Sequence, residues 1–353
     1  MISKETFGEN HIRELQIESK VDPGLIERTL YAFGLLEALA RVGLSFIFKG
    51  GTSLLLLFPS PKRLSTDIDI IVEPGTDIDS YIEKASHIFP FNHKEEQVRV
   101  GKNNIIKRHF KFTYNSPLKH RPLYILLDVL FEANHYERVI SREIQNDLLL
   151  TEGRNLSVLI PSADCILGDK LTAFAPYTTG IPLRVEKDME VIKQFYDICM
   201  LIDVFQNYHD FEQTYFAVSD AEIRYRGNEI TSRQALEDTI QAAVCIGSRG
   251  KVSADDFPFY VKGTRDVLNH IYERPFSMEI ASVMAPKVIY LAACLLTGTP
   301  FERVIDYENF KNETLTQEDL MTMKAFRKLK TTAYTYLVMA DRLLSDYRKT
   351  MTL

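Results

Sequence analysis

The spacing of apolar residues changes near Pro161, and this change constrains the fold of the 353-residue chain more than any other feature. Before it, helical spacing alternates with short runs of alternating or continuous apolar residues, which are typical of strands. After it, apolar residues recur at helical spacing. The pattern predicts an α+β fold, with a mixed sheet and its helices over residues 1–160 and an all-helical domain over residues 161–353.

The first part contains one well-marked helix and several strands. Asp22 and Pro23 supply a capping acceptor and a first-turn proline, and Gly43 marks the end of that helix. Leu54–Phe58 is expected to begin another helix. The expected strands are Ile68–Val72, Ile105–Tyr114 and Tyr124–Phe131. The expected helices of the second part are Asp164–Ala175, Val185–Phe205, Ser232–Ile246, Gly263–Tyr272, Met278–Leu296 and Thr316–Tyr347, the last capped by Thr316 and Asp319.

Composition narrows the class of protein without choosing a function. With 45% apolar and 25% charged residues and a net charge of −6, the chain has the balance of a soluble globular protein. Four widely spaced cysteines without a CxxC pair predict buried thiols in a reducing compartment. The polar N-terminus has no signal-peptide pattern, and the apolar stretch Val283–Leu296 is too short to span a bilayer. We therefore expect a cytoplasmic protein with no membrane partner.

Asp67 and Asp69 carry the strongest chemical signal. Residues two apart on a strand face the same side, so these carboxylates lie together while Ile68 and Ile70 enter the core. Neighbouring carboxylates repel each other unless a cation or a proton lies between them. Mg²⁺ prefers one or two carboxylates completed by substrate phosphate. Taken alone, such a pair is more often a solvated strand face near a turn.

Two further features favour a metal site for phosphate chemistry. Gly50-Gly51-Thr52-Ser53 joins a predicted strand to a helix start, where a phosphate can approach the glycine backbone and hydroxyl groups can donate to it. Alone, this run would more often be a plain turn. Asp128 lies within an apolar strand, where an unpaired carboxylate costs several kcal/mol. Together these residues suit a two-metal site for phosphoryl transfer, with ions about 3.5–4 Å apart.

In this order the residues resemble the AbiEii/AbiGii toxin family of DNA polymerase β-like nucleotidyltransferases. The resemblance rests first on Lys49–Leu54, Arg63, Ser65, Asp67, Asp69 and Asp128. The segments Asp169–Phe174 and Lys193–Ile198 are similar to the family's lysine-bearing helix and to its helix with a basic residue four positions before an Asp. Gln194 stands where an Asp is common in that second helix. The resemblance covers roughly residues 30–205.

The resemblance implies a polymerase β-like domain that moves a nucleoside monophosphate from an NTP to an acceptor. The cofactors would be two Mg²⁺ ions, or Mn²⁺ in their place. The implied metal ligands are Asp67, Asp69 and Asp128, and the implied nucleotide contacts are Gly50, Gly51, Thr52, Ser53, Arg63 and Ser65. The helical domain would complete the active site and acceptor binding through the implied catalytic residues Lys170, Lys193 and Asp197. Asp197 would orient Lys193 or form a surface pair with it. Relatives are toxins encoded beside an antitoxin, act in phage defence, and include enzymes that modify the 3′ end of tRNA.

RNA, at the 3′ end of a tRNA, is the expected acceptor, and a small molecule or a protein is the alternative. Between Arg99 and Leu127 the chain has no acidic residue and carries the basic residues Arg99, Lys102, Lys107, Arg108, Lys111, Lys119 and Arg121. This stretch suits RNA phosphates and equally suits a solvated hairpin. A cationic acceptor such as an aminoglycoside would instead predict an acidic pocket. A catalytically silent nucleotide-binding module is the remaining alternative, and the presence of all three carboxylates disfavours it.

Overall fold

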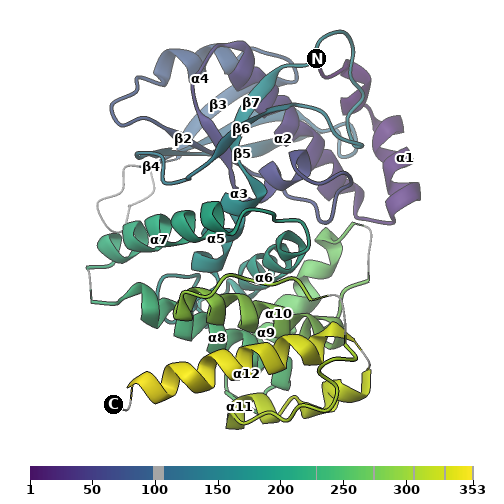
Figure 1. The fold of residues 1–353 in the computed structure, drawn as a ribbon. Helices are drawn as coiled ribbons and strands as arrows, with labels where there is room; N and C mark the ends of the chain where they lie inside the picture. The colour runs from purple at the N-terminus through teal and green to yellow at the C-terminus, as the bar shows by residue number, and fades with distance from the viewer. Residues whose placement is uncertain (98–106, 228, 273–274, 305–306, 330, 352–353) are drawn as a thin grey trace. The chain divides into compact units, whose positions relative to one another are not determined.

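The computed structural model describes residues 1–97, 107–227, 229–272, 275–304, 307–329 and 331–351. The chain forms two compact units (Figure 1). Unit 1 consists of Met1–Ile166 and Asn269–Pro275, and unit 2 consists of Leu167–Leu268 and Phe276–Leu353. The predicted α+β class, with a mixed sheet and a helical C-terminal region, is confirmed.

Unit 1 is built on a seven-stranded mixed sheet in the order β3-β4-β5-β2-β1-β7-β6. The strands are β1 (Ile47–Lys49), β2 (Ile68–Val72), β3 (Phe91–Gln97), β4 (Lys107–Asn115), β5 (Pro122–Phe131), β6 (Val139–Glu143) and β7 (Ser157–Pro161). β2 pairs with β5, and β1 with β7, in parallel, and the other neighbours are antiparallel. β2 has the bounds that its alternating sequence predicts. Residues 105–106 of the expected second strand lie outside the described residues.

The helices of unit 1 are mostly N-terminal. They are the 3₁₀ helix η1 (Lys4–Phe7), α1 (Glu9–Ser19), α2 (Pro23–Arg41), α3 (Gly50–Ser53), the 3₁₀ helix η2 (Leu54–Leu56) and α4 (Asp79–Ser86). The predicted cap of α2 is confirmed, because the Asp22 side chain accepts a hydrogen bond from the Leu25 amide. The expected helix at Leu54–Phe58 is instead the single 3₁₀ turn η2, which directly follows the short α3.

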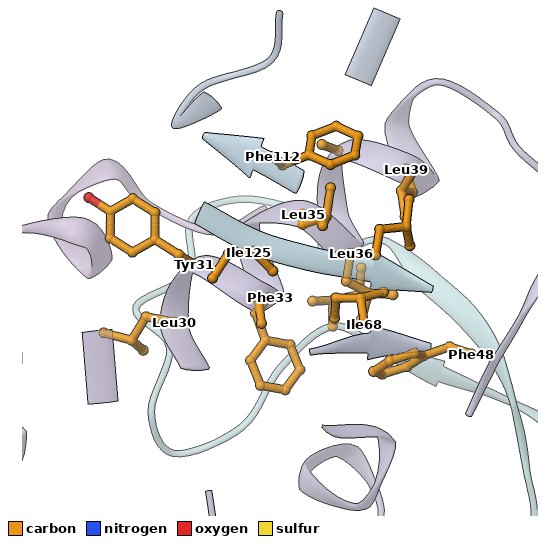
Figure 2. Close-up of a cluster of buried hydrophobic side chains, with 14 of the residues drawn as sticks. Leu30, Tyr31, Phe33, Leu35, Leu36, Leu39, Phe48, Ile68, Phe112 and Ile125 are labelled. Atoms are coloured by element: carbon orange, nitrogen blue, oxygen red, sulfur yellow. The ribbon is translucent and has the colours of Figure 1, made fainter. Parts of the chain in front are cut away.

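The main core of unit 1 lies between α2 and one face of the sheet (Figure 2). Strand alternation puts Phe48, Ile68 and Ile125 on this face, where they meet leucines of α2. Each fully buried side chain of this kind contributes about 1.5–3 kcal/mol. The opposite face carries a smaller apolar cluster around Ile71 and Tyr136. Core packing therefore fixes which side chains of each strand remain on that second face.

The helices of unit 2 follow one another along the chain, and α5 carries the chain from unit 1 into unit 2. They are α5 (Ala163–Ala173), α6 (Asp188–Ile202), α7 (Tyr208–Tyr225), α8 (Ser232–Ser248), α9 (Phe257–Val267), η3 (Leu268–His270), α10 (Met278–Thr297), α11 (Glu318–Met321), η4 (Lys324–Leu329) and α12 (Thr332–Met351). By length and composition α10 could cross a membrane, but 67% of its apolar window is buried, as in the core helix of a globular protein. α10 also extends beyond the apolar stretch that was expected to be too short to span a bilayer.

Two helix predictions in unit 2 were wrong. The segment predicted as one helix over Thr316–Tyr347 contains α11, η4 and α12. Thr316 does not cap a helix, because the buried Asp341 of α12 accepts hydrogen bonds from its amide and its hydroxyl. The helix expected at Gly263–Tyr272 starts earlier, at Phe257, and ends before the chain returns to unit 1.

The segment Asn269–Pro275, called the returning segment below, pairs with the chain just before β2. The Leu64 amide donates to the His270 carbonyl at 2.7 Å, and the Tyr272 amide donates to the Lys62 carbonyl at 3.0 Å. Arg63 and Ile271 form the antiparallel bridge between these bonds. Unit 1 is therefore completed by residues that follow helices α5 to α9 in the sequence.

Candidate active site

A row of polar residues crosses four adjacent strands on the sheet face opposite α2. The register pairs Lys49 of β1 with Asp69 of β2, Asp69 with Asp128 of β5, and Asp128 with His109 of β4. Directly paired residues face the same side of a sheet, and neighbouring strands lie about 4.8 Å apart. The carboxylates of Asp69 and Asp128 are therefore neighbours. All four side chains are partly exposed, so the row is open to a ligand.

Asp67 lies one residue before β2 and is exposed. Its backbone carbonyl accepts a hydrogen bond of 2.6 Å from the Thr52 hydroxyl, which ties the start of β2 to α3. The structure thus places Asp67 at the edge of the row. The spacing argument from the sequence placed Asp67 on the strand beside Asp69, whereas β2 begins one residue later, at Ile68.

The turn made by Gly50 and Gly51 lies directly against this row. Gly50 has a φ of +80°, which favours glycine, and a Cβ atom there would overlap the Asp69 carboxylate. A Cβ atom at Gly51 would lie 2.6 Å from Nη2 of Arg63 and 3.0 Å from Oγ of Ser65. The predicted glycine turn, the Asp-Ile-Asp strand and the side chains of Arg63 and Ser65 therefore form one site.

Thr52 and Ser53 stabilise this turn from within. Both are fully buried. The Thr52 hydroxyl donates to Asp67 as described, and the Ser53 hydroxyl donates to the Gly50 carbonyl at 2.8 Å. In this structure the two hydroxyl groups hold the backbone of the turn in place, and they do not face solvent.

Arg63 supports the turn from the other side. Its side chain is buried against Gly51, and Nη1 donates to the Leu64 carbonyl at 3.3 Å. Its backbone is bridged to Ile271 of the returning segment. The position of this guanidinium is therefore fixed by packing and by backbone pairing.

Two residues of the row were not among the site residues predicted from the sequence. His109 lies within the basic stretch of the sequence, and Lys49 directly precedes the glycine motif. The Nδ1 atom of His109 lies 2.6 Å from Oδ1 of Asp128. The Lys49 ammonium lies 5.8 Å from the centre of the Tyr136 ring. Their partners depend on strand order and register, for which the sequence gives no local signal.

The site can be tested for its fit to a divalent cation. In the described part of the chain, no group of three or more His, Cys, Asp or Glu side chains converges as a complete metal site. Asp69 and Asp128 nevertheless stand side by side on paired strands. Mg²⁺ commonly takes only one or two protein carboxylates, with water and substrate phosphate as its other ligands. The donor set therefore fits a metal that binds together with a nucleotide.

Comparison with known proteins agrees with this chemistry. Residues 34–271, more than half of the chain, match the family described as nucleotidyl transferase AbiEii toxin, type IV TA system. The chain belongs to the AbiEii family. The matched range contains the glycine turn, the polar row and the first part of the returning segment. Membership in this toxin family implies an NTP substrate and an antitoxin partner.

Two solved Helicobacter pylori structures are similar to this AbiEii chain. The structure of JHP933 is 13% identical with a TM-score of 0.43, covering 77% of this chain and 93% of that chain. A second protein, described as a proposed nucleotidyltransferase, is 14% identical with a TM-score of 0.45, covering 77% and 96% respectively. A search of curated proteins found no match.

The implied catalytic residues of the helical region lie on α5 and α6 of unit 2. The Lys170 ammonium lies 3.0 Å from Oδ2 of Asp197, and their side chains are 9% and 2% exposed. Asp197 is therefore buried beside Lys170 and does not lie on the surface of α6. Lys193 is partly exposed on α6. The catalytic roles implied for these three residues of the AbiEii protein stay predictions.

Among its described residues, the basic stretch does not form one continuous patch in the AbiEii structure. Arg99 and Lys102 lie outside the described residues. Arg108 pairs with Glu96 at 2.7 Å and Asp79 at 2.8 Å, and its hydrogen bonds lower the pKa of Glu96. Alternation along β4 puts Lys111 on the face of His109 and Arg108 on the other. The Lys111 ammonium lies 4.8 Å from the centre of the Tyr124 ring. Only part of the stretch therefore shares a face with the carboxylates.

Proposed function

We propose that this AbiEii protein transfers a nucleoside monophosphate from an NTP to the 3′ end of an RNA, with Mg²⁺ as its metal. The observation that carries the proposal is the in-register Asp69–Asp128 pair beside the Gly50–Gly51 turn. Two carboxylates held next to this glycine turn suit the binding of a metal and a triphosphate together. A purely structural surface pair of carboxylates would require no such glycine approach.

The side chains of the protein would mainly position the metal and the triphosphate. Asp69 and Asp128, with Asp67 beside them, would hold the divalent metal, which neutralises phosphate charge and lowers the pKa of the acceptor hydroxyl. Because paired strands hold Asp69 and Asp128, their carboxylates need little rearrangement when substrate binds. Gly50 and Gly51 let the Asp69 carboxylate and the Arg63 guanidinium lie directly against the turn, whose backbone the Thr52 hydroxyl ties to the start of β2, so both groups would face a triphosphate bound there.

An RNA acceptor is supported by the side chains that share a face with Asp128. Tyr124 lies four residues before Asp128 on β5, about 13 Å away along the strand, and its side chain is 48% exposed beside Lys111. An exposed aromatic ring can stack on a base, and a neighbouring lysine can bind a phosphate. Lys119 and Arg121 are exposed in the turn between β4 and β5. A single strand whose 3′ end reaches Asp128 would pass over these groups.

Labelling tests the reaction and the acceptor together. The purified protein is incubated with Mg²⁺, each α-labelled NTP in turn and total cellular RNA. We expect label in RNA of tRNA size, and we expect Asp67→Asn or EDTA to remove it while the melting temperature of the protein is unchanged. Glu73→Gln, which neutralises an exposed carboxylate just after β2, is the matched control and should label as the parent does.

Full labelling by Asp67→Asn would contradict the metal-ligand assignment. Label that appears in protein or in a small molecule, with none in any RNA, would keep the transfer chemistry and replace the acceptor. Binding of NTP without any labelled product would favour a nucleotide-binding module.

A further inference from the structure

His109 has a contact that the proposed reaction does not yet use. It lies directly opposite Asp128 on the antiparallel neighbour strand, and its Nδ1 atom is 2.6 Å from Oδ1 of Asp128. The two side chains are only 13% and 28% exposed. On the other side of β4, Gln97 of β3 is paired with His109. The imidazole is therefore flanked by a strand on each side and has little freedom to turn away.

We propose that His109 is a positioning residue that fixes the rotation of the Asp128 carboxylate for metal binding. This inference rests on the proposed function of the site. A carboxylate can rotate about its last bond and has two oxygen atoms that can bind a metal or accept hydrogen bonds. The N–H group at Nδ1 donates to Oδ1, which leaves Oδ2 for the metal. Asp128 is then a ligand through one oxygen, and its geometry is set before the metal arrives.

The contact is suited to this role whether or not the imidazole is charged. Nδ1 can carry the donated proton in the neutral ring as well as in the imidazolium form. Hydrogen bonds that orient a metal-binding side chain commonly change metal affinity or activity about 10–100-fold when they are removed. If His109 only stabilised the pairing of β4 with β5, its replacement would lower the stability of the sheet and leave the metal affinity of the carboxylates unchanged.

The test compares two replacements of His109. Asn carries its amide nitrogen the same number of bonds from Cα as Nδ1 of histidine, so His109→Asn can still donate to Oδ1. His109→Leu has similar bulk and no donor. Mn²⁺ binding to the full-length protein is measured by electron paramagnetic resonance, and initial transfer rates are measured against Mg²⁺ concentration. Thr113→Ala, on the same strand and face, is the control, because no carboxylate contact links Thr113 to Asp128.

We expect His109→Leu to weaken Mn²⁺ binding about 10–100-fold and to raise the Mg²⁺ concentration at half-maximal rate by a similar factor. His109→Asn and Thr113→Ala should stay close to the parent. If His109→Leu does not fold, His109→Ala replaces it. Parent-like Mn²⁺ binding by a folded variant without the donor would overturn the positioning role alone. Failure of the parent itself to bind Mn²⁺ or transfer a nucleotide would overturn the proposed function and this inference with it.

Discussion

Gly50 is the residue on which the shape of the site depends most directly. Its backbone is in the left-handed region, and the Asp69 carboxylate occupies the space that a Cβ atom would take. Any side chain at this position must therefore both strain the backbone and displace a proposed metal ligand. Gly43 has nearly the same φ, +79°, with nothing within 4 Å of its would-be Cβ. Comparing substitutions at the two glycines therefore separates the destabilisation due to the backbone conformation from the destabilisation due to overlap with Asp69.

We predict that Gly43→Ala lowers the free energy of unfolding by about 1–2 kcal/mol and leaves nucleotide transfer intact. Gly50→Ala should lower it by more than that and reduce transfer about 100-fold, because displacement of a reacting group by about 1 Å has an effect of that size. Urea unfolding and the labelling assay measure the two effects. Equal behaviour of the two variants would show that Asp69 tolerates the added methyl group.

At the residue scale the sequence could single out Asp69 and Asp128 as candidates, but it could not predict which side chains they contact. Alternation fixed the shared face of Asp69 with its strand neighbours, and an acidic residue within the apolar run marked Asp128. The partner of Asp128 could not be predicted, because His109 becomes its neighbour only through the β4–β5 register. The same holds for Arg63, whose approach to Gly51 depends on the packing of the loop before β2.

At the scale of elements, β4 shows how one strand divides its basic residues between two environments. Lys111 faces the side of Asp128 and lies beside Tyr124, whereas Arg108 faces the other side and pairs with Glu96 and Asp79. A count of positive charge along the sequence treats these residues as equal. The pleat of the strand makes them different.

We predict that Lys111→Gln weakens RNA binding and reduces the slope of log affinity against log salt concentration by about 0.7, the value for one contact to a single-stranded phosphate. Arg108→Gln removes the same charge from the opposite face and should leave the slope unchanged. Fluorescence anisotropy at several salt concentrations measures both. A slope that falls equally for the two variants would mean that only net charge matters.

Elements with strong local patterns were the predictable ones. β2 follows its alternation, and α2 starts at its Asp-Pro cap. β3 was missed because Phe91–Gln97 is largely charged and polar and becomes a strand only by pairing with β4. The helix expected over Thr316–Tyr347 is divided because Asp341 binds the Thr316 and Gln317 amides, a contact between distant residues. The strand order, which brings the polar residues of the row together, likewise depends on contacts between residues far apart in the sequence.

At the scale of the whole molecule, the four cysteines are divided between the two units. Cys199, Cys245 and Cys294 are buried in unit 2, and Cys165 is buried in unit 1, as predicted for a protein without disulfides. Burial raises the pKa of the three unit 2 thiols to about 12, from an ordinary value of 9.0. The folded state therefore keeps these protons above pH 9, where the unfolded state loses them. Their contribution to stability is complete below pH 9 and is lost as the pH rises towards 12.

We predict that none of the three thiols reacts with iodoacetamide in the folded protein at pH 8, because the thiolate is the reactive form and each thiol is buried. All three should react in denaturant. Between pH 9 and 11 they should become reactive together as unit 2 loses stability, and mass spectrometry of the labelled peptides follows them one by one. Rapid labelling of a single cysteine at pH 8 would contradict the burial of that residue.

The returning segment also connects the site to the order in which the ribosome makes the chain. The backbone around Arg63 acquires its partners His270 and Tyr272 only after about 200 further residues have been synthesised. At about 5–20 residues per second, this takes roughly 10–40 s. For that time the nascent chain has its carboxylates and its glycine turn without the bridge behind Arg63. The glycine turn and the backbone around Arg63 are therefore completed late in translation, after helices α5 to α9 have been made.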